Sequence, residues 1–308
     1  MIKFLFVAIL LLLLFGGGAK MVVAGGARSL NAADRLLGSG DGAQLLIADQ
    51  PYGRGPRQSL DVWGPEGTQA GDRLPVVIFF YGGGWNSGDR ESYGFAGRAL
   101  AQQGFLTIIP DYRLTPRAQW PDFLADSAAA VAWVREHAPA IGGDPDRIAL
   151  MGHSAGAYNA VMLALDPDWL RKAGSDPSAI RGVAALAGPY DFLPLEKGGS
   201  ADKAMGKVRP AERTQPITYA RGDAPSLWLA TGEDDDVVRP RNSRNLAAAI
   251  ERAGGNATLR LYPGMGHTGI VMALSAPFRG KGPVLADATD FLRGVTARRV
   301  APIEAAAQ

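Results

Sequence analysis

A serine between two glycines is the feature of this sequence with the clearest chemical potential. Residues 152–156 read Gly-His-Ser-Ala-Gly, with Ser154 at the centre. The preceding residues 147–151 are typical of a strand, and a helical pattern begins at Ala155. A serine on a sharp strand-to-helix turn is exposed as a nucleophile, and the helix N-terminus favours negative charge beside it. The alternative is an ordinary glycine-rich helix cap with Ser154 as the capping residue.

Three consecutive glycines suggest where the negative charge of such a reaction would be bound. Gly82-Gly83-Gly84-Trp85 follows an apolar run that ends at Tyr81. An oxyanion needs two or three N–H donors that are fixed before the reaction, and we assign this role to the N–H groups of Gly83, Gly84 and Ala155. The alternatives are a flexible surface loop and a phosphate-binding loop. No Lys-Ser/Thr pair follows the glycines, which argues against a nucleotide P-loop.

A serine hydroxyl needs a histidine to take its proton, and His267 is the best candidate. The chain has three histidines, His137, His153 and His267. His153 is adjacent to Ser154 in a tight turn, where neighbouring side chains diverge, and His137 ends a helical stretch that resembles a solvated face. His267 lies just past a strand in a glycine-rich loop, where a base carried by a loop is expected.

The carboxylate that orients the histidine should lie between Ser154 and His267 in the chain. A predicted strand leads into the acidic loop 231–238, which contains Asp234, Asp235 and Asp236. Its position at the end of a strand suits the catalytic acid, although a helix-capping cluster has the same composition. The residues alone do not choose among the three aspartates.

These groups need a scaffold, and apolar runs that alternate with helical patterns indicate an α/β fold. The run 76–81 has no polar alternation, as expected for a strand with helices on both faces of its sheet. We therefore predict a mostly parallel central sheet with helices on both faces. The expected strands are 76–81, 105–109, 147–151, 182–186, 226–230 and 258–262, and the expected helices are 95–103, 123–137, 155–165, 241–253 and 284–293.

Two further regions complete the predicted domain. Residues 45–49 and 59–63 are expected to pair as an antiparallel edge. The stretch 191–224 has weak periodicity and several Pro and Gly residues, so we expect a small lid excursion above the sheet. This excursion, Trp85 and Tyr158 would wall a substrate pocket; the alternative for Trp85 is a packing residue that holds the glycine loop.

The N-terminus is expected to form a separate region. Lys3 precedes an unbroken apolar run, residues 4–15, which suits the core of an export signal and is short for a membrane span. We expect residues 1–24 to be a signal peptide or an N-terminal membrane anchor, and the protein to be periplasmic, secreted or membrane-anchored. The alternative is a buried N-terminal helix. The remaining divisions are a linker over 25–43, an α/β domain over 44–298 and a C-terminal tail over 299–308.

The composition excludes several kinds of partner and chemistry. The chain of 308 residues has a formal net charge of +2 and scattered Lys and Arg residues, so we expect no nucleic-acid partner. The absence of cysteine excludes disulfides, thiolate metal sites and a cysteine nucleophile. With so few histidines and no cysteine, we also expect no metal site. No feature of the sequence indicates an oligomeric state.

Taken in chain order, the segment 81–85, the segment 152–156, the acidic loop and His267 resemble α/β-hydrolase fold serine esterases. In particular they resemble bacterial carboxylesterases of the hormone-sensitive-lipase and feruloyl-esterase-like (BD-FAE) groups, over about residues 50–295. The resemblance implies that small-molecule carboxylic esters with short to medium acyl chains are hydrolysed through an acyl-enzyme, without a cofactor. It places the oxyanion hole at Gly83 and Gly84, and it selects Asp235 from the pattern Gly-x-x-Asp-x-x-Val. Supporting stretches are 111–114, 143–147 and 188–191.

The sequence departs from this family at Tyr81, where a histidine that braces the glycine loop is usual. A tyrosine hydroxyl can brace the loop as well, so the change bears on subfamily and substrate. Kynurenine formamidases carry a similar glycine segment, which keeps arylformamidase activity as an alternative. Peptidase activity is less well supported, because the residues around Ser154 read His-Ser-Ala. A non-catalytic binding protein on the same fold is the alternative from another class.

Overall fold

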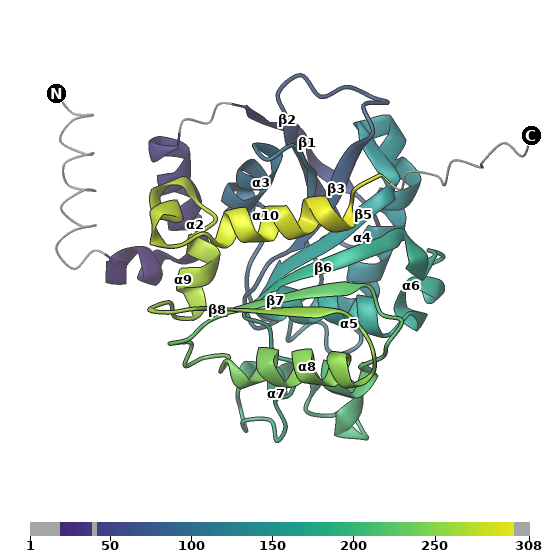
Figure 1. The fold of residues 1–308 in the computed structure, drawn as a ribbon, viewed down its shortest axis with the longest axis vertical. Helices are drawn as coiled ribbons and strands as arrows, with labels where there is room; N and C mark the ends of the chain where they lie inside the picture. Colours follow the sequence, from purple (N-terminus) through teal and green to yellow (C-terminus); the bar gives the residue numbers. More distant parts are fainter. Residues whose placement is uncertain (1–18, 39–41, 299–308) are drawn as a thin grey trace, which may run out of the picture.

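The computed structural model describes residues 19–38 and 42–298, which form an eight-stranded sheet with helices on both faces (Figure 1). The predicted tail 299–308 and most of the predicted signal peptide or anchor lie outside the described residues. In the part of the chain that is described, no helix is long and apolar enough to cross a membrane.

The sheet has the mostly parallel arrangement that the sequence predicted. Its spatial order is β1-β2-β4-β3-β5-β6-β7-β8. β1 pairs antiparallel with β2, which confirms the predicted edge, and β2 pairs antiparallel with β4; the other neighbours are parallel. The strands are β1 Ala43–Pro51, β2 Ser59–Pro65, β3 Leu74–Phe80, β4 Leu106–Pro110, β5 Gly143–His153, β6 Ile180–Leu186, β7 Ser226–Gly232 and β8 Ala257–Tyr262.

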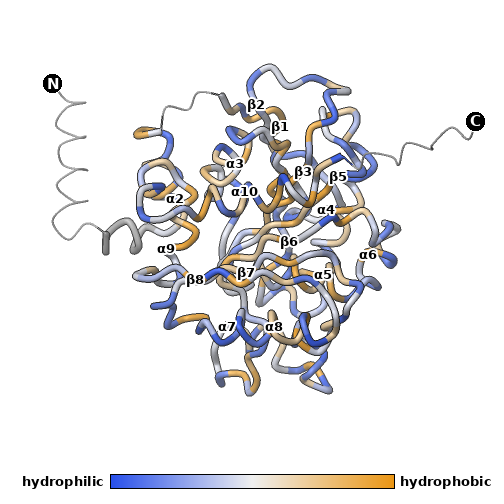
Figure 2. The backbone as a smooth tube through the Cα atoms, in the orientation of Figure 1, coloured by the Kyte–Doolittle hydropathy of each residue, from blue (hydrophilic) through white to orange (hydrophobic). Residues whose placement is uncertain are grey.

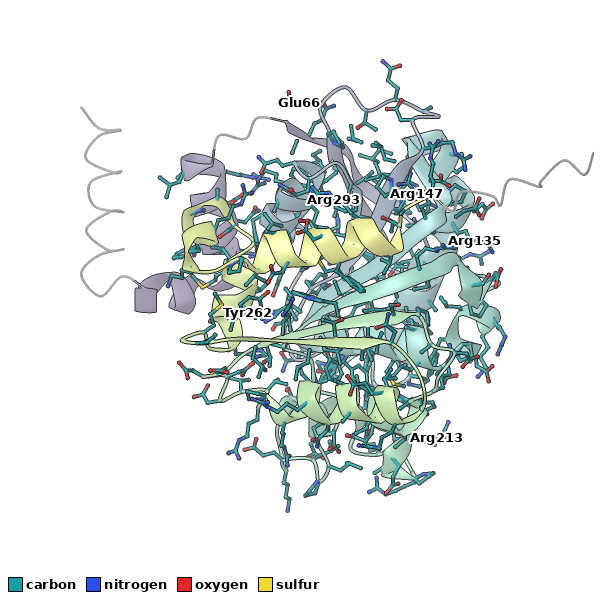
Figure 3. The ribbon with its side chains drawn as sticks, in the orientation of Figure 1. Glu66, Arg135, Arg147, Arg213, Tyr262 and Arg293 are labelled. Atoms are coloured by element: carbon teal, nitrogen blue, oxygen red, sulfur yellow. The ribbon has the colours of Figure 1, made fainter. Side chains whose placement is uncertain are left out.

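The uninterrupted apolar run of β3 is explained by two hydrophobic layers. Successive side chains of a strand point to opposite faces, so Val77 and Phe79 enter one cluster while Ile78 and Phe80 enter the other. Helices α3 (Gly94–Ala101) and α10 (Val284–Val295) contribute to the first cluster, and α4 (Asp122–His137), α5 (Ala155–Leu165) and α8 (Arg241–Arg252) to the second. In Figure 2 hydrophobic residues follow the central strands, and in Figure 3 the exposed Glu66 and Arg213 project from the periphery.

Four further helices connect or flank this core. They are α2 (Ala19–Leu37), α6 (Asp168–Lys172), α7 (Ser200–Met205) and α9 (His267–Met272). The predicted excursion 191–224 contains α7 and two 3-10 turns, Ala211–Thr214 and Pro216–Tyr219. The carboxyl ends of β3, β5, β7 and β8 meet at one edge of the sheet, which is where ligands bind in open α/β sheets.

The prediction that residues 25–43 form a linker is wrong for the described part of that segment. Beyond a kink at Gly26, which has φ of 63°, α2 packs on the domain and buries Leu30 and Ala33. The Arg98 Nε of α3 donates to the Asp34 carboxylate at 2.8 Å, and both side chains are buried. The high Gly, Ala and Ser content suggested a flexible connection, but small residues also allow a helix to pack closely.

Candidate active site

Ser154 lies on a strained turn between β5 and α5. Its backbone has φ of 54° and ψ of −121°, a conformation that is rare for residues other than glycine. The local sequence permits this turn because a side chain on Gly156 would collide with the Phe80 carbonyl of β3. The Ser154 N–H donates to the Leu186 carbonyl at the end of β6, at 2.9 Å. The hydroxyl is thereby held at the carboxyl edge of the sheet.

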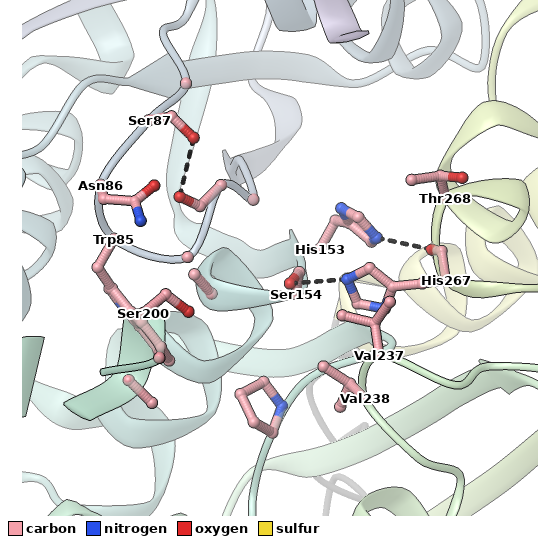
Figure 4. A pocket seen from close by; sticks show the side chains of 18 of the residues that line it. Trp85, Asn86, Ser87, His153, Ser154, Ser200, Val237, Val238, His267 and Thr268 are labelled. Carbon is pink, nitrogen blue, oxygen red and sulfur yellow. Dashed lines mark hydrogen bonds between the residues drawn. The ribbon is translucent and has the colours of Figure 1, made fainter. Parts of the chain in front are cut away.

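The structure brings Ser154, His267 and Asp235 into one hydrogen-bonded chain. His267 Nε2 lies 2.9 Å from Ser154 Oγ (Figure 4). On the other side of the ring, His267 Nδ1 lies 2.9 Å from Asp235 Oδ2. Asp235 is buried, and its Oδ1 accepts hydrogen bonds from the Val237 and Val238 N–H groups at 3.0 and 2.8 Å. Both carboxylate oxygens are therefore occupied, which fixes the orientation of the imidazole.

The other candidates considered from sequence lie apart from this chain. Asp234 and Asp236 are exposed, whereas Asp235 is buried. His137 stacks on Trp133 within α4, with ring centroids 4.3 Å apart. The Asp234 N–H donates to the Met265 carbonyl at 3.0 Å, so the acidic loop and the histidine loop are also tied together by their backbones.

The three-glycine loop lines the same cavity as Ser154 and His267. Gly83 and Gly84 have positive φ values of 132° and 57°, which a side chain would disfavour. Within residues 19–38 and 42–298, the N–H groups of Gly83, Gly84 and Ala155 donate to no protein acceptor. Ser87 Oγ donates to the Gly83 carbonyl at 3.0 Å, which closes the loop on itself (Figure 4).

Beneath this loop, a network of largely buried side chains forms hydrogen bonds with the Tyr81 hydroxyl. The Tyr81 hydroxyl donates to Asp111 at 2.8 Å and accepts from Arg57 at 2.7 Å. The same Arg57 nitrogen donates to the Gly88 carbonyl at 2.8 Å. Burial raises the pKa of the Tyr81 hydroxyl well above its usual value of 10, so the hydroxyl stays protonated and can donate. Tyr81 thus connects the end of β3 to the far side of the glycine loop.

His153 lies behind the imidazole of His267. Its Nε2 is 3.0 Å from the His267 carbonyl, and the two rings are 4.9 Å apart (Figure 4). Burial, reinforced by the charge that His267 can carry, lowers the pKa of His153 to about 3. The ring is therefore neutral at neutral pH, and its Nε2–H donates to the His267 carbonyl. This contact of His153 could not be predicted from the sequence, because the loop that approaches it comes from far along the chain.

The cavity around Ser154 has a volume of about 970 Å³ and walls of different character. The glycine loop forms one wall, and the lid excursion contributes Phe192, Pro194, Leu195 and Ser200. Val237 and Val238, directly after Asp235, also line the cavity. Gly26, Ala27 and Arg28 of α2 complete the lining, a contribution that the sequence analysis missed because it assigned them to a linker.

The two proposed pocket residues have different positions. Trp85 lines the cavity, but it is almost fully buried and its indole N–H donates to Asn159 at 3.2 Å. Tyr158 packs edge-on against Trp85, with centroids 5.1 Å apart, and is not among the described residues that line the cavity. The prediction for Tyr158 is therefore wrong: its position on α5 directs it into the core behind Trp85.

The sequence is similar to a family model and to several proteins that are named as esterases. The sequence model of the BD-FAE family matches residues 60–250. Esterase LipQ of Mycobacterium tuberculosis (strain ATCC 25618 / H37Rv) is 32% identical over 82% of this chain and 63% of its own length. A probable isoprenylcysteine alpha-carbonyl methylesterase ICME of Oryza sativa subsp. japonica is 30% identical over 74% of this chain and 59% of its own length. The aligned part of the chain thus spans roughly three fifths of these relatives.

Solved structures share the fold. A truncated carbohydrate esterase from gut microbiota superimposes with a TM-score of 0.70 at 21% identity, covering 83% of this chain and 96% of that one. An esterase B of Lactobacillus rhamnosis, solved with a C4-C4 SN3 tributyrin phosphonate inhibitor, gives a TM-score of 0.73 at 22% identity, covering 90% and 95%. These likenesses confirm the α/β-hydrolase fold predicted from the sequence.

Proposed function

Because the chain belongs to the BD-FAE family, we propose that it is a serine carboxylesterase that hydrolyses small-molecule esters with short to medium acyl chains. Ser154 is the nucleophile, His267 the base and Asp235 the acid that orients the base. The N–H groups of Gly83, Gly84 and Ala155 form the oxyanion hole, and no cofactor takes part. The observation that carries the proposal is the continuous chain of hydrogen bonds from Asp235 through His267 to Ser154.

The mechanism follows from these contacts. His267 Nε2 takes the Ser154 proton while the hydroxyl oxygen attacks the ester carbonyl carbon, and the Asp235 carboxylate stabilises the imidazolium. The carbonyl oxygen becomes an oxyanion and accepts hydrogen bonds from the loop N–H groups. When the tetrahedral intermediate collapses, the bond to the alcohol oxygen breaks and His267 protonates the leaving alcohol. Water then attacks the acyl-enzyme by the same steps, which releases the acid and restores Ser154.

The surroundings of the triad support this cycle electrostatically. The Asp235 carboxylate can offset the positive charge of the His267 imidazolium, whereas His153 behind it stays neutral because burial lowers its pKa to about 3. A second cation beside His267 would disfavour protonation of the imidazole. The backbone N–H groups of the loop require no reorganisation when the oxyanion forms, which is where preorganised donors have their largest effect.

Replacement of Ser154 by Ala tests the proposal directly. We expect turnover of p-nitrophenyl acetate to fall by about 10⁶-fold, close to the background rate, because the nucleophile is lost. The circular dichroism spectrum and melting temperature should be unchanged, and a fluorophosphonate probe should label the wild type but not the variant. A variant that retains wild-type turnover would refute the assignment. A panel of p-nitrophenyl esters of graded chain length, with N-formylkynurenine for comparison, would define the acyl preference.

We also propose that the protein acts outside the cytoplasm, exported or held at the membrane by its N-terminal segment. The support is the apolar run 4–15 behind Lys3, followed by small residues at 16–19. N-terminal sequencing of the protein recovered from separated soluble and membrane fractions would distinguish a cleaved signal from a retained anchor. Recovery of the intact chain in the cytosol would contradict both forms of the proposal.

A further inference from the structure

Helix α2 forms part of the wall of the catalytic cavity. Gly26, Ala27 and Arg28 line the same cavity as Ser154 and His267. The family match begins only at residue 60, so this wall lies outside the part of the chain that the family model describes. A segment that precedes the matched domain therefore borders the cavity that contains Ser154 and His267.

The helix is attached firmly to the elements that carry the glycine loop. Asn31 Nδ2 donates to the Glu91 carbonyl at 2.6 Å, just beyond that loop. Arg98 bridges Asn31 and Asp34, with its Nη2 donating to each at 2.6 Å. On the other side, the Asp34 carboxylate accepts from the Ala276 N–H at 2.7 Å. Because these groups are largely buried, α2 from Gly26 onward has a set position relative to the active site.

The sequence that leads into this helix is suited to a lipid bilayer. The apolar run 4–15 lies between Lys3 and Lys20, and no acidic residue precedes Asp34. Basic residues next to an apolar segment are attracted to anionic lipids. Only six residues separate Lys20 from the first cavity-lining residue at position 27 beyond the kink, which is about 10 Å of helix. A bilayer that held the apolar run would therefore lie close to the mouth of the cavity.

The cavity lining includes an apolar side chain that is largely exposed. Val237 lines the cavity and is 69% exposed, which makes it one of a small number of large apolar side chains so exposed among the described residues. Leu195 and Phe192 of the lid excursion line the cavity nearby. Apolar side chains in the lining, one of them largely exposed, suit a substrate that passes from a hydrocarbon environment into the site.

We propose that the N-terminal segment holds the mouth of the catalytic cavity against a phospholipid bilayer, and that the substrates are esters of water-insoluble amphiphiles that enter from the membrane. The proposal rests on the esterase function given above and names the physical class of its substrate. The chemistry is unchanged: one ester and one water yield one acid and one alcohol. The structural element that couples membrane and active site is α2.

The first test compares two substrates in vesicles made of equal parts of phosphatidylcholine and phosphatidylglycerol. The full chain is assayed on p-nitrophenyl acetate in solution and on p-nitrophenyl decanoate, a medium-chain ester, dissolved in the vesicles. In the double variant Leu11→Arg, Leu13→Arg, we expect the rate on the vesicle substrate to fall by more than about tenfold, since charges in an apolar run oppose insertion. The rate on p-nitrophenyl acetate should stay within about twofold, because neither residue belongs to the proposed triad or to the glycine loop. The double variant Leu11→Ile, Leu13→Ile is the matched control and should resemble the wild type on both substrates.

The second test distinguishes attachment of the protein to the bilayer from orientation of the cavity towards it. A flexible insertion of about 20 Gly and Ser residues between Ala24 and Gly25 should leave vesicle binding and p-nitrophenyl acetate hydrolysis intact, while it lengthens the reach to the bilayer. We expect the rate on the vesicle substrate to fall by about five- to tenfold, because the cavity mouth is no longer held at the surface.

Three results would overturn the proposal: absence of vesicle binding by the full chain, equal vesicle rates in the wild type and the Arg variant, or loss of residues 1–24 from the mature protein. Failure of the esterase function would look different. In that case p-nitrophenyl acetate itself would not be hydrolysed, or would be hydrolysed equally by the Ser154→Ala variant.

Discussion

The two loops that face Ser154 differ in the number of charged groups that support them. The glycine loop is braced from below by ionised groups: Arg57 and Arg90 both donate to Asp111, which also accepts from Tyr81. The loop that carries His267 is held by Asp235 in front and by the neutral His153 behind. One loop thus rests on a network of several charges, and the other on a single carboxylate.

The difference follows from what each loop contributes. The three glycines offer backbone N–H groups and have no side chains, so the charged network supports them through Tyr81 and the Gly88 carbonyl. The histidine loop offers a side chain whose proton affinity matters, and further charges near it would disturb that affinity. The arrangement suggests that charge is used for rigidity where the functional group does not titrate, and is avoided where it does.

The largest expected effect is at the single carboxylate of the histidine loop. Asp235→Asn keeps the shape but removes the charge and favours the wrong imidazole tautomer, so kcat should fall by about 10⁴-fold. Stopped assays on p-nitrophenyl acetate across pH would measure this loss. The matched control is Asp234→Asn, the exposed neighbour, which should retain activity within about twofold. A near-normal kcat in Asp235→Asn would contradict the proposal that the Asp235 carboxylate takes part in catalysis.

A second substitution tests the charged support of the glycine loop. Asp111→Asn removes one of the two buried carboxylates that pair with Arg90 and leaves only Asp61, so the free energy of unfolding should fall by about 2–3 kcal/mol. Arg90 also donates to the exposed Asp49 at 2.6 Å, and the control Asp49→Asn should cost less than about 1 kcal/mol. Urea unfolding monitored by tryptophan fluorescence would compare them. Equal losses in the two variants would show that burial of the pair does not matter.

The Tyr81 hydroxyl tests whether that support reaches the oxyanion hole. Tyr81→Phe leaves Asp111 and Arg57 each short of a partner, so we expect a stability loss of about 1–3 kcal/mol. If the network positions the loop N–H groups, kcat should fall by about tenfold while KM changes little. Tyr112→Phe is the control, since the Tyr112 hydroxyl donates to the Tyr81 carbonyl at 2.7 Å. An unchanged kcat in Tyr81→Phe would show that the hydrogen bonds of Tyr81 with Asp111 and Arg57 stabilise the fold but do not position the oxyanion hole.

The smallest effect near neutral pH is expected at His153. His153→Gln keeps a donor behind His267, so kcat should remain within about tenfold of the wild type. The pH dependence of stability should change more clearly. Because the pKa of His153 falls from 6.5 to about 3 on folding, the unfolded chain binds more protons in that interval, and wild-type stability declines as pH falls from 6.5 towards 3.

The Gln variant has no titrating group at this position and should lose less stability over the same interval. Thermal unfolding measured at several pH values between 7 and 4 gives the comparison. His137→Gln, on the half-buried face of α4, serves as the control and should follow the wild type. A parallel decline in wild type and His153→Gln would argue against a buried neutral imidazole.

Much of the fold could be read from local patterns. The run in β3 and the helical pattern of α5 have periods set by their own backbone geometry, and they were predicted to within a few residues. The turn at Ser154 was recognisable because its Gly-x-Ser-x-Gly pattern lies directly between a strand pattern and a helical pattern, although the need for Gly156 comes from the distant Phe80 carbonyl of β3. Helix α9 and the packed position of α2 were not predicted, because one is short and the other depends on Arg98 of a different helix.

The sequence by itself therefore determined the α/β arrangement, the strand-to-helix turn of Ser154, the acidic loop 231–238 and the position of His267 just past a strand, whereas the choice of Asp235 within the acidic loop came from the family resemblance. Only the tertiary structure decided which groups support them: His153 behind His267, Asp111 beneath Tyr81 and α2 beside the cavity. The physical reason is that hydrophobic periodicity acts over a few residues of one element. Buried hydrogen bonds and ion pairs instead join elements that are distant in the chain, and they form only when those elements pack together.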